Sequence, residues 1–246
     1  MLLLIAAPSR AGQPSLDSLL SLETRLMKQA SQKPADAPLT VQVAQTRAQI
    51  AYRKAGQGDI EGAAAYLENS LALAPDHADR WTMLGDLYQL VGAPGAGHLA
   101  QTAYERSLKL DPKRVQTRAR LASLFLHQGR FLKAIEEFEP LVQGDGDEAP
   151  RTDYLQPLAA AYAASEENGR GARFFQRMAK KGGGPAFKIA AAVLHWNSHE
   201  DVPLLGPIKR GSALKLIKEA ESEASGTDLA LYALRLRHRW ENASSP

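Results

Sequence analysis

The sequence predicts an all-α protein built from repeated helix hairpins. Apolar residues recur at helical spacing in one segment after another, and no segment shows sustained strand-type alternation bounded by hairpin turns. The central part of the chain is self-similar at a period of 34 to 37 residues. With 246 residues, of which 44% are hydrophobic and 23% charged, the chain has enough apolar surface to fold.

The composition excludes several classes of site. The chain has no cysteine, which rules out disulfides, thiolate zinc sites, iron–sulfur clusters and cysteine nucleophiles. No run of about 18 apolar residues occurs, so we expect no membrane-spanning helix. The net charge of +3 is small and spread along the chain, whereas nucleic-acid binders concentrate Lys and Arg on one face. We therefore predict no nucleic-acid partner.

The first residues resemble the back half of a secretory signal. The apolar stretch Leu2 to Ala7 is followed by Pro8 and by the small pair Ser9 and Ala11, where a signal peptidase could cut. A basic start is missing, and the apolar stretch is short. We interpret residues 1–14 as a possible truncated signal peptide, which predicts a periplasmic or cell-envelope protein. An apolar first segment of a cytoplasmic protein is the alternative.

Residues 15–43 are predicted to form an N-terminal helix and a linker. The helix covers Ser15 to Ala30, where Leu16, Leu19, Leu20, Leu26 and Met27 make a helical stripe. The segment from Lys33 to Pro38 contains two prolines and is predicted to be the linker.

The repeat occupies residues 44–186. A shift of 34 residues aligns Ile50 with Leu84, and a shift of 37 aligns Ala63 with Ala100. The difference places a three-residue insertion in the Gly/Pro-rich turn at 93–97, where insertions are tolerated. The same pattern of small and aromatic residues continues to about residue 186. We predict four units, at about 44–77, 78–114, 115–148 and 152–186.

The second unit contains Trp81, Leu84, Gly85, Tyr88, Ala100, Tyr104 and Pro112. It resembles the tetratricopeptide repeat, whose pattern is W-x2-L-G-x2-Y, then A-x3-F, then P. Arg47 in the first unit and Arg118 in the third stand where an aromatic residue is usual. The resemblance implies a right-handed α-solenoid of tetratricopeptide-type helix hairpins with flanking capping helices.

The small residues of the repeat have a physical role of their own. Gly85 and the alanines that recur with it are small because the two helices of a hairpin approach closely there, and a larger side chain would push them apart. Aromatic residues such as Tyr104 then fill the space between successive hairpins.

Residues 187–246 are predicted to form a C-terminal helical capping region. The candidate helices are Ala186 to His199, Ser212 to Ala224 and Thr227 to Trp240. Solenoids need atypical terminal units to cover the ends of the stack, and the first two helices could also be a degenerate fifth hairpin. In the last helix, Leu229, Tyr232, Leu236 and Trp240 share one face. We interpret the basic residues 235, 237, 238 and 239 as complementing the C-terminus of this helix, and a binding patch for an acidic partner is the alternative.

The resemblance also implies a binding surface. In this family the first helix of each hairpin lines a concave groove that holds an extended peptide or a partner helix. The side chains there are small, neutral or acidic, which favours an apolar or basic partner with Tyr52 as aromatic anchor; solvated helix positions are the alternative. The predicted groove residues are Gln45, Ala48, Tyr52, Asp79, Thr82, Asp86, Gln89, Gln116, Ala119, Ser123, Asp153 and Gln156.

The sequence offers no catalytic constellation. It has no G-x-S-x-G elbow, phosphate-binding glycine loop or HExxH motif, so we predict no enzyme activity, no catalytic residue and no cofactor. His195 and His199 share a helix face, and Glu200 or Asp201 could add an oxygen ligand. Two histidines are not a site, so we predict no metal.

These observations predict a non-catalytic scaffold or adaptor that mediates protein–protein interaction, in the bacterial cell envelope. The alternative is a permanent accessory subunit or assembly factor of an envelope complex. Resemblance to exported repeat proteins suggests c-type cytochrome maturation, secretion or pilus assembly as its context. A third hypothesis is an enzyme or metal-binding protein built on His195 and His199.

Overall fold

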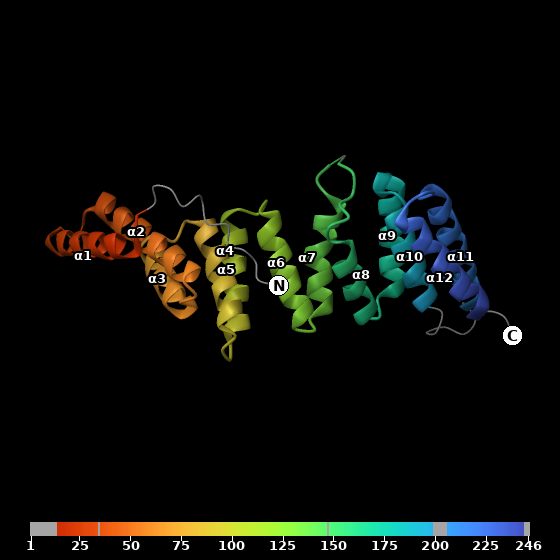
Figure 1. The fold of residues 1–246 in the computed structure, drawn as a ribbon, viewed down its shortest axis with the longest axis horizontal. Coiled ribbons are helices and arrows are strands. Elements are labelled where there is room, and N and C mark those ends of the chain that lie inside the picture. The colour runs from red at the N-terminus through yellow and green to blue at the C-terminus, as the bar shows by residue number, and fades with distance from the viewer. Residues whose placement is uncertain (1–13, 34, 147, 199–205, 244–246) are drawn as a thin grey trace. The chain divides into compact units, whose positions relative to one another are not determined.

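A computed structural model of the chain describes residues 14–33, 35–146, 148–198 and 206–243. These residues form helices and contain no β-strand, which confirms the all-α prediction. No helix among them is long and apolar enough to cross a bilayer. Apart from Pro14, the possible signal peptide lies outside the described residues. The elements are α1 Leu16–Gln32, α2 Ala37–Gly56, α3 Ile60–Leu73, α4 Ala78–Val91, α5 Ala96–Leu110, α6 Val115–His127, α7 Phe131–Gln143, α8 Leu155–Ala164, α9 Asn168–Met178, η1 Ala179–Gly183 (a short π-helical turn), α10 Pro185–Asn197, α11 Gly206–Glu223 and α12 Asp228–Ala243 (Figure 1).

The chain divides into two compact units, residues 1–117 and 118–246. In the first unit each helix from α1 to α5 packs against the next one along the chain. In the second unit the same holds from α7 to α12. Each unit is therefore a succession of neighbouring helices, as expected of a repeat architecture.

Helices α1, α2 and α3 begin at side-chain caps. The Asp36 carboxylate accepts a hydrogen bond from the Leu39 backbone N–H at 3.0 Å, and the Asp59 carboxylate accepts one from Gly62 at 2.9 Å. Pro38 lies in the first turn of α2, where its missing N–H leaves no bond unmade. Helix α2 therefore starts at Ala37, inside the predicted linker and ahead of residue 44.

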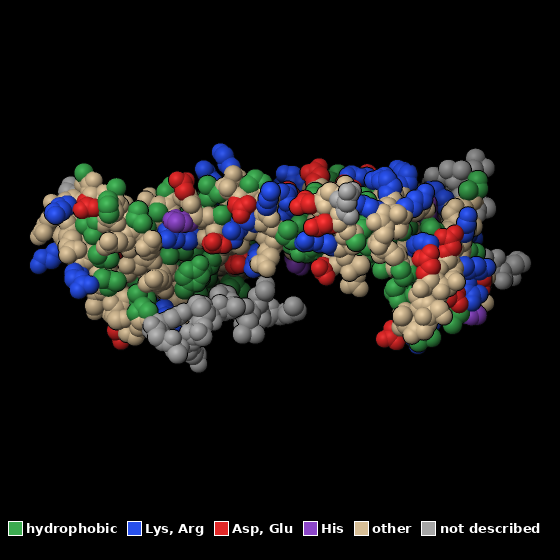
Figure 2. Space-filling view, turned by 90° about the horizontal axis from the view of Figure 1, so that it is seen from above, with side chains coloured by type: hydrophobic (Ala, Val, Ile, Leu, Met, Phe, Trp, Pro, Cys, Tyr) green, Lys and Arg blue, Asp and Glu red, His purple; other side chains and the backbone are tan. Residues whose placement is uncertain are grey.

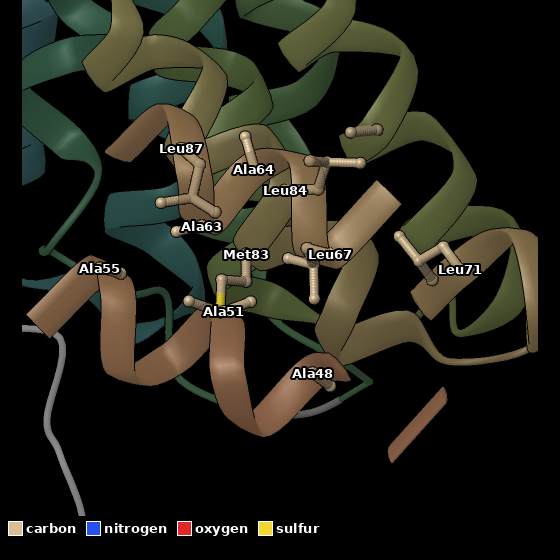
Figure 3. Close-up of a cluster of buried hydrophobic side chains, with 11 residues drawn as sticks. Ala48, Ala51, Ala55, Ala63, Ala64, Leu67, Leu71, Met83, Leu84 and Leu87 are labelled. Atoms are coloured by element: carbon tan, nitrogen blue, oxygen red, sulfur yellow. The ribbon is translucent and has the colours of Figure 1, made fainter. Parts of the chain in front are cut away.

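The core of the first unit is rich in alanine. Side chains from α2, α3, α4 and α5 form one buried cluster, and most of them are labelled in Figure 3. Small side chains let these helices lie close together. The cluster consists of Ala48, Ala51, Ala55, Ala63, Ala64, Leu67, Leu71, Met83, Leu84, Leu87 and Ala103.

Gly85 marks the close approach of α4 and α5. A Cβ atom at this position would lie 2.5 Å from Cε1 of Tyr104, whose side chain is fully buried. This confirms that the second hairpin, formed by α4 and α5, needs a residue without a side chain at this position.

Ion pairs replace the usual aromatic residue in the first and third hairpins. In the second hairpin the Trp81 indole donates to the Pro75 carbonyl at 2.7 Å. At the equivalent positions, Arg47 pairs with Glu23 on α1 at 2.8 Å and Arg118 pairs with Glu137 on α7 at 2.7 Å. The two arginines thus hold neighbouring helices together through charge.

The core of the second unit is aromatic. Tyr162, Phe174, Phe175 and Phe187 are buried, and the rings of Tyr162 and Phe175 meet edge to face at 5.8 Å. These side chains come from α8, α9 and α10, so they join three successive helices.

The last three helices, α10, α11 and α12, share a separate cluster of buried side chains. Trp240 of α12 stacks on Trp196 of α10 with ring centroids 4.7 Å apart. Leu229 and Leu236 pack against the same cluster, but Tyr232 is 50% exposed. The prediction that Tyr232 shares this face is wrong, because Ala233 turns into the core at that level instead.

Candidate functional site

The surface around Tyr52 brings together groups from several elements of the first unit. The Tyr52 side chain on α2 is 42% exposed. Burial of part of the ring and the Asp79 carboxylate raise the pKa of the Tyr52 phenol, while the positive charges of Arg80 and Arg114 act in the opposite direction. The phenol therefore faces two arginines and one carboxylate.

Asp79 is already paired within this surface. Its carboxylate forms an ion pair with the Arg114 guanidinium, which also lies 3.9 Å from Asp111. The Arg114 Nε donates to the Thr117 hydroxyl at 3.4 Å. The negative charge of Asp79 is therefore already neutralised by Arg114.

Arg80 was missed by the sequence reasoning. Its side chain is buried, and Nη1 donates to Ser70 Oγ at 3.1 Å. Ser70 in turn donates to the carbonyl of Ala44 at 2.7 Å, so the arginine is held against both helices of the preceding hairpin. Burial lowers the pKa of Arg80 and the nearby Tyr52 phenol raises it. The sequence signal that could have indicated Arg80 is its place next to Trp81, on a helix expected to line a groove.

Two predicted groove residues lie in the interior. Ala48 is part of the alanine-rich core. Thr82 is buried, and its hydroxyl lies 2.8 Å from that of Ser107 and 2.7 Å from that of Thr117. The prediction that these two side chains line a groove is wrong, because the adjacent helices α3, α5 and α6 cover them.

Two other predicted groove residues, Asp86 and Gln89, form hydrogen bonds with the buried Tyr104. The Tyr104 hydroxyl donates to the Asp86 carboxylate at 2.7 Å, and the Gln89 amide donates to the same hydroxyl. Asp86 is half-buried and Gln89 exposed. Gln45 and Gln116 are also exposed.

The remaining predicted residues belong to the second unit. Ala119 and Ser123 are half-buried on α6, and Gln156 is exposed on α8. Asp153 is exposed and precedes α8, which begins at Leu155. Partner binding by the exposed residues in both units stays a prediction.

His195 is an unusual polar group in the second unit. The Gln176 amide nitrogen lies 2.8 Å from His195 Nε2, and Nδ1 is buried without a hydrogen-bond partner. Burial lowers the pKa of the imidazole, and the charges of Lys209 and Arg173 lower it further. His199, Glu200 and Asp201 lie outside the described residues. Within the described ranges no three His, Asp or Glu side chains are grouped to hold a metal.

A basic surface on α9 was also missed. Residues 168–199 contain no Asp or Glu. They contain six basic residues: Arg170, Arg173, Arg177, Lys180, Lys181 and Lys188. The interpretation that charge is spread along the chain is therefore wrong for this segment. Figure 2 shows Lys and Arg side chains gathered where α9 and α10 lie. Counting charge in short windows would have found it.

The chain resembles known proteins in fold but not in sequence. No family model matches it, and no curated protein matches it. The C-terminal part of a tetratricopeptide-repeat-containing protein from Cytophaga hutchinsonii superposes with a TM-score of 0.57 at 14% identity, covering 92% of this chain and 83% of that one. A crystal structure of the MamA protein superposes with a TM-score of 0.52 at 18% identity, covering 82% of this chain and 98% of that one.

Proposed function

The chain has a tetratricopeptide-repeat fold, and from this premise we propose that it is a non-catalytic scaffold or adaptor that binds a partner protein. The observation that carries the proposal is the exposed ring of Tyr52 beside Arg80 and Arg114. Tyrosine and arginine are enriched among the residues that dominate binding energy at protein interfaces. A half-exposed aromatic ring with fixed polar neighbours is therefore a suitable anchor.

The charges around Tyr52 favour an apolar partner segment over a basic one. Asp79 is already paired with Arg114, and Arg80 adds a second positive charge nearby. A basic segment would be repelled by Arg114 and by the positive charge of the buried Arg80, while Asp79 and Asp111 are already close to Arg114. An apolar segment would gain the ring of Tyr52 without breaking the ion pair.

The test begins with a photo-crosslinking amino acid at position 52, introduced in the source organism to identify the partner. With that partner purified, we expect Tyr52→Ala to weaken binding by about 30-fold, the loss typical of an anchor residue worth about 2 kcal/mol. Tyr232→Ala is the matched control, because it removes a similarly exposed ring from α12. If Tyr52→Ala binds the partner normally at unchanged helicity, this surface is not the binding site.

The cell envelope is the proposed location, and the signal-like residues Met1 to Ala11 support it. The alternative is a cytoplasmic protein. Mass spectrometry of the protein from source cells separates the two: a chain beginning near Gly12 supports export, and an intact Met1 contradicts it.

A permanent accessory subunit or assembly factor of an envelope complex, in cytochrome maturation, secretion or pilus assembly, is the second candidate. Ile208 and Leu231 in the last two helices are more than half exposed, and such apolar surface is typical of stable interfaces. A permanent subunit co-purifies at fixed stoichiometry, whereas an adaptor is recovered largely as free protein.

A further inference from the structure

Four basic side chains share one side of α9 and its continuation. Arg170, Arg173, Arg177 and Lys180 follow one another at steps of three and four residues, which places them on a single helix face. All four are exposed. We call them the basic face of α9. The other side of the helix packs into the aromatic core through Phe175 and Met178.

Most of this charge is not neutralised within the described part of the chain. Arg170 pairs with Glu139 at 3.1 Å. Arg173, Arg177 and Lys180 form no ion pair with any carboxylate among the residues that the structure describes. The Arg177 guanidinium lies 5.8 Å from the centre of the Phe174 ring, which holds it in place. Three positive charges are therefore available to an outside partner.

The neighbouring helices add charge of both signs near this face. Glu139 of α7 pairs with Arg170, and Glu219 and Glu223 of α11 pair with Lys188. Lys209 of α11 and Arg173 of α9 both act on the half-buried His195 of α10 and disfavour its protonated form. The segment 168–199 has no carboxylate of its own. An anionic group that approaches this face would therefore relieve repulsion among fixed like charges.

The face is too short for a continuous polyanion. From Arg170 to Lys180 it spans about 15 Å at 1.5 Å per residue. Glu166 and Glu167 precede it. Beyond the other end, Lys181 donates to the Gly146 carbonyl at 2.7 Å, in the loop that contains Asp145 and Glu148. A nucleic-acid backbone would run on into these acids at either end.

The face also lacks what a membrane surface would require. An interfacial helix inserts large apolar side chains next to its basic ones. Here Phe174, Phe175 and Met178 are at most 5% exposed. The anionic partner that remains after these two exclusions is a short run of carboxylates on a protein.

We propose that the basic face of α9 docks a short acidic segment of a partner protein, with carboxylates distributed over about 15 Å. The surface lies in the second unit and uses none of the residues around Tyr52, so it is a second binding surface beyond the proposed function.

The test uses a fluorescein-labelled peptide with glutamates at three- and four-residue steps in an alanine background. Fluorescence anisotropy at low salt measures its binding to the full chain. We expect the triple variant Arg173→Glu, Arg177→Glu, Lys180→Glu to weaken binding by at least about tenfold. The control triple variant Lys28→Glu, Lys109→Glu, Lys215→Glu changes net charge equally at other exposed positions, and we expect less than about a threefold loss.

Several results would overturn the proposal. They are an equal loss in both triple variants, no binding of the peptide by the wild-type chain, and tighter binding of a short DNA duplex or of phosphatidylserine vesicles in parallel titrations. Self-association that the α9 variant abolishes would assign the face to a second copy instead. If circular dichroism shows that the α9 variant is unfolded, the single Gln variants at the same three positions repeat the test, with the same expected order of loss.

Discussion

At the scale of single residues, Gly85 carries a constraint that can be tested directly. Replacing it with alanine puts a methyl group 2.5 Å from the Tyr104 ring, so α4 and α5 must separate or the ring must shift. We expect Gly85→Ala to lower the free energy of unfolding by about 1–3 kcal/mol, the usual cost of overpacking. Urea denaturation followed by circular dichroism measures it.

Gly56→Ala is the matched control, because a Cβ atom there meets nothing within 4 Å. Alanine is the better helix former, so this change should be neutral or stabilising by up to about 1 kcal/mol. A Gly85→Ala protein as stable as the Gly56→Ala protein would contradict the close approach of the two helices.

Gly85 was predictable because a small residue recurs at a fixed place in the repeat. The positions of Thr82 and Arg80 were not, since burial on α4 depends on which neighbouring helix covers each flank, and the sequence of α4 does not contain that information. Thr82 illustrates this, because its two hydroxyl partners, Ser107 and Thr117, come from later helices.

At the scale of helices, one type of tyrosine–glutamate bond joins successive hairpins. The Tyr88 hydroxyl of α4 donates to Glu68 of α3 at 2.6 Å, and that of Tyr162 on α8 donates to Glu139 of α7. Burial raises the pKa of both phenols, and the glutamate hydrogen bonds raise it further. Each bond requires the phenol to keep its proton.

These pKa shifts predict a loss of stability in alkali. The unfolded chain ionises its tyrosines near about pH 10, whereas the folded chain keeps these two protonated to higher pH. The stabilisation is therefore complete below about pH 10 and is lost progressively as the pH rises from there through the raised pKa values of the folded chain. Above it, the free energy of unfolding should fall more steeply for the wild type than for the double variant Tyr88→Phe, Tyr162→Phe.

Urea titrations at a series of pH values measure this slope. Tyr232→Phe changes an exposed ring on α12 and should keep the wild-type slope. Parallel slopes in the wild type and the double variant would show that the two phenols are not protected in the folded chain.

Helices were easier to predict than their ends. The segment from Lys33 to Pro38 was interpreted as a linker because it holds two prolines, yet α2 begins at Ala37 with Pro38 in its first turn. The sequence alone does not distinguish a proline at the start of a helix from a proline in a linker. The Asp36 cap distinguishes them only when its bond to Leu39 is seen.

At the scale of the whole molecule, each unit has its own core. Trp240→Ala removes the ring stacked on Trp196 and should loosen α10 to α12. Because repeat hairpins contact only their neighbours, we expect faster amide hydrogen exchange in residues 185–198 and 206–243 and unchanged exchange in residues 37–91. Hydrogen-exchange mass spectrometry resolves these segments.

Tyr232→Ala provides the comparison, since it removes an exposed ring from the same helix. Faster exchange in residues 37–91 of the Trp240→Ala protein would mean that the chain unfolds as one cooperative unit rather than locally.

The repeat period made the architecture predictable, because a fold built from one hairpin needs only the pattern of that hairpin. The basic face of α9 escaped prediction for the opposite reason. The net charge of the chain averages Arg173, Arg177 and Lys180 with acids located elsewhere. A charged surface depends on where the individual charges lie, and the net charge of the chain does not contain that information.

The tyrosine–glutamate bond limits how such a chain can be shuffled. Its glutamate lies in the closing helix of one hairpin and its tyrosine in the opening helix of the next, at Glu68 with Tyr88 and again at Glu139 with Tyr162. A hairpin cut out at its own boundaries would leave one half of the bond behind. Duplicating a hairpin therefore keeps the bond only where the new neighbour supplies the matching glutamate or tyrosine.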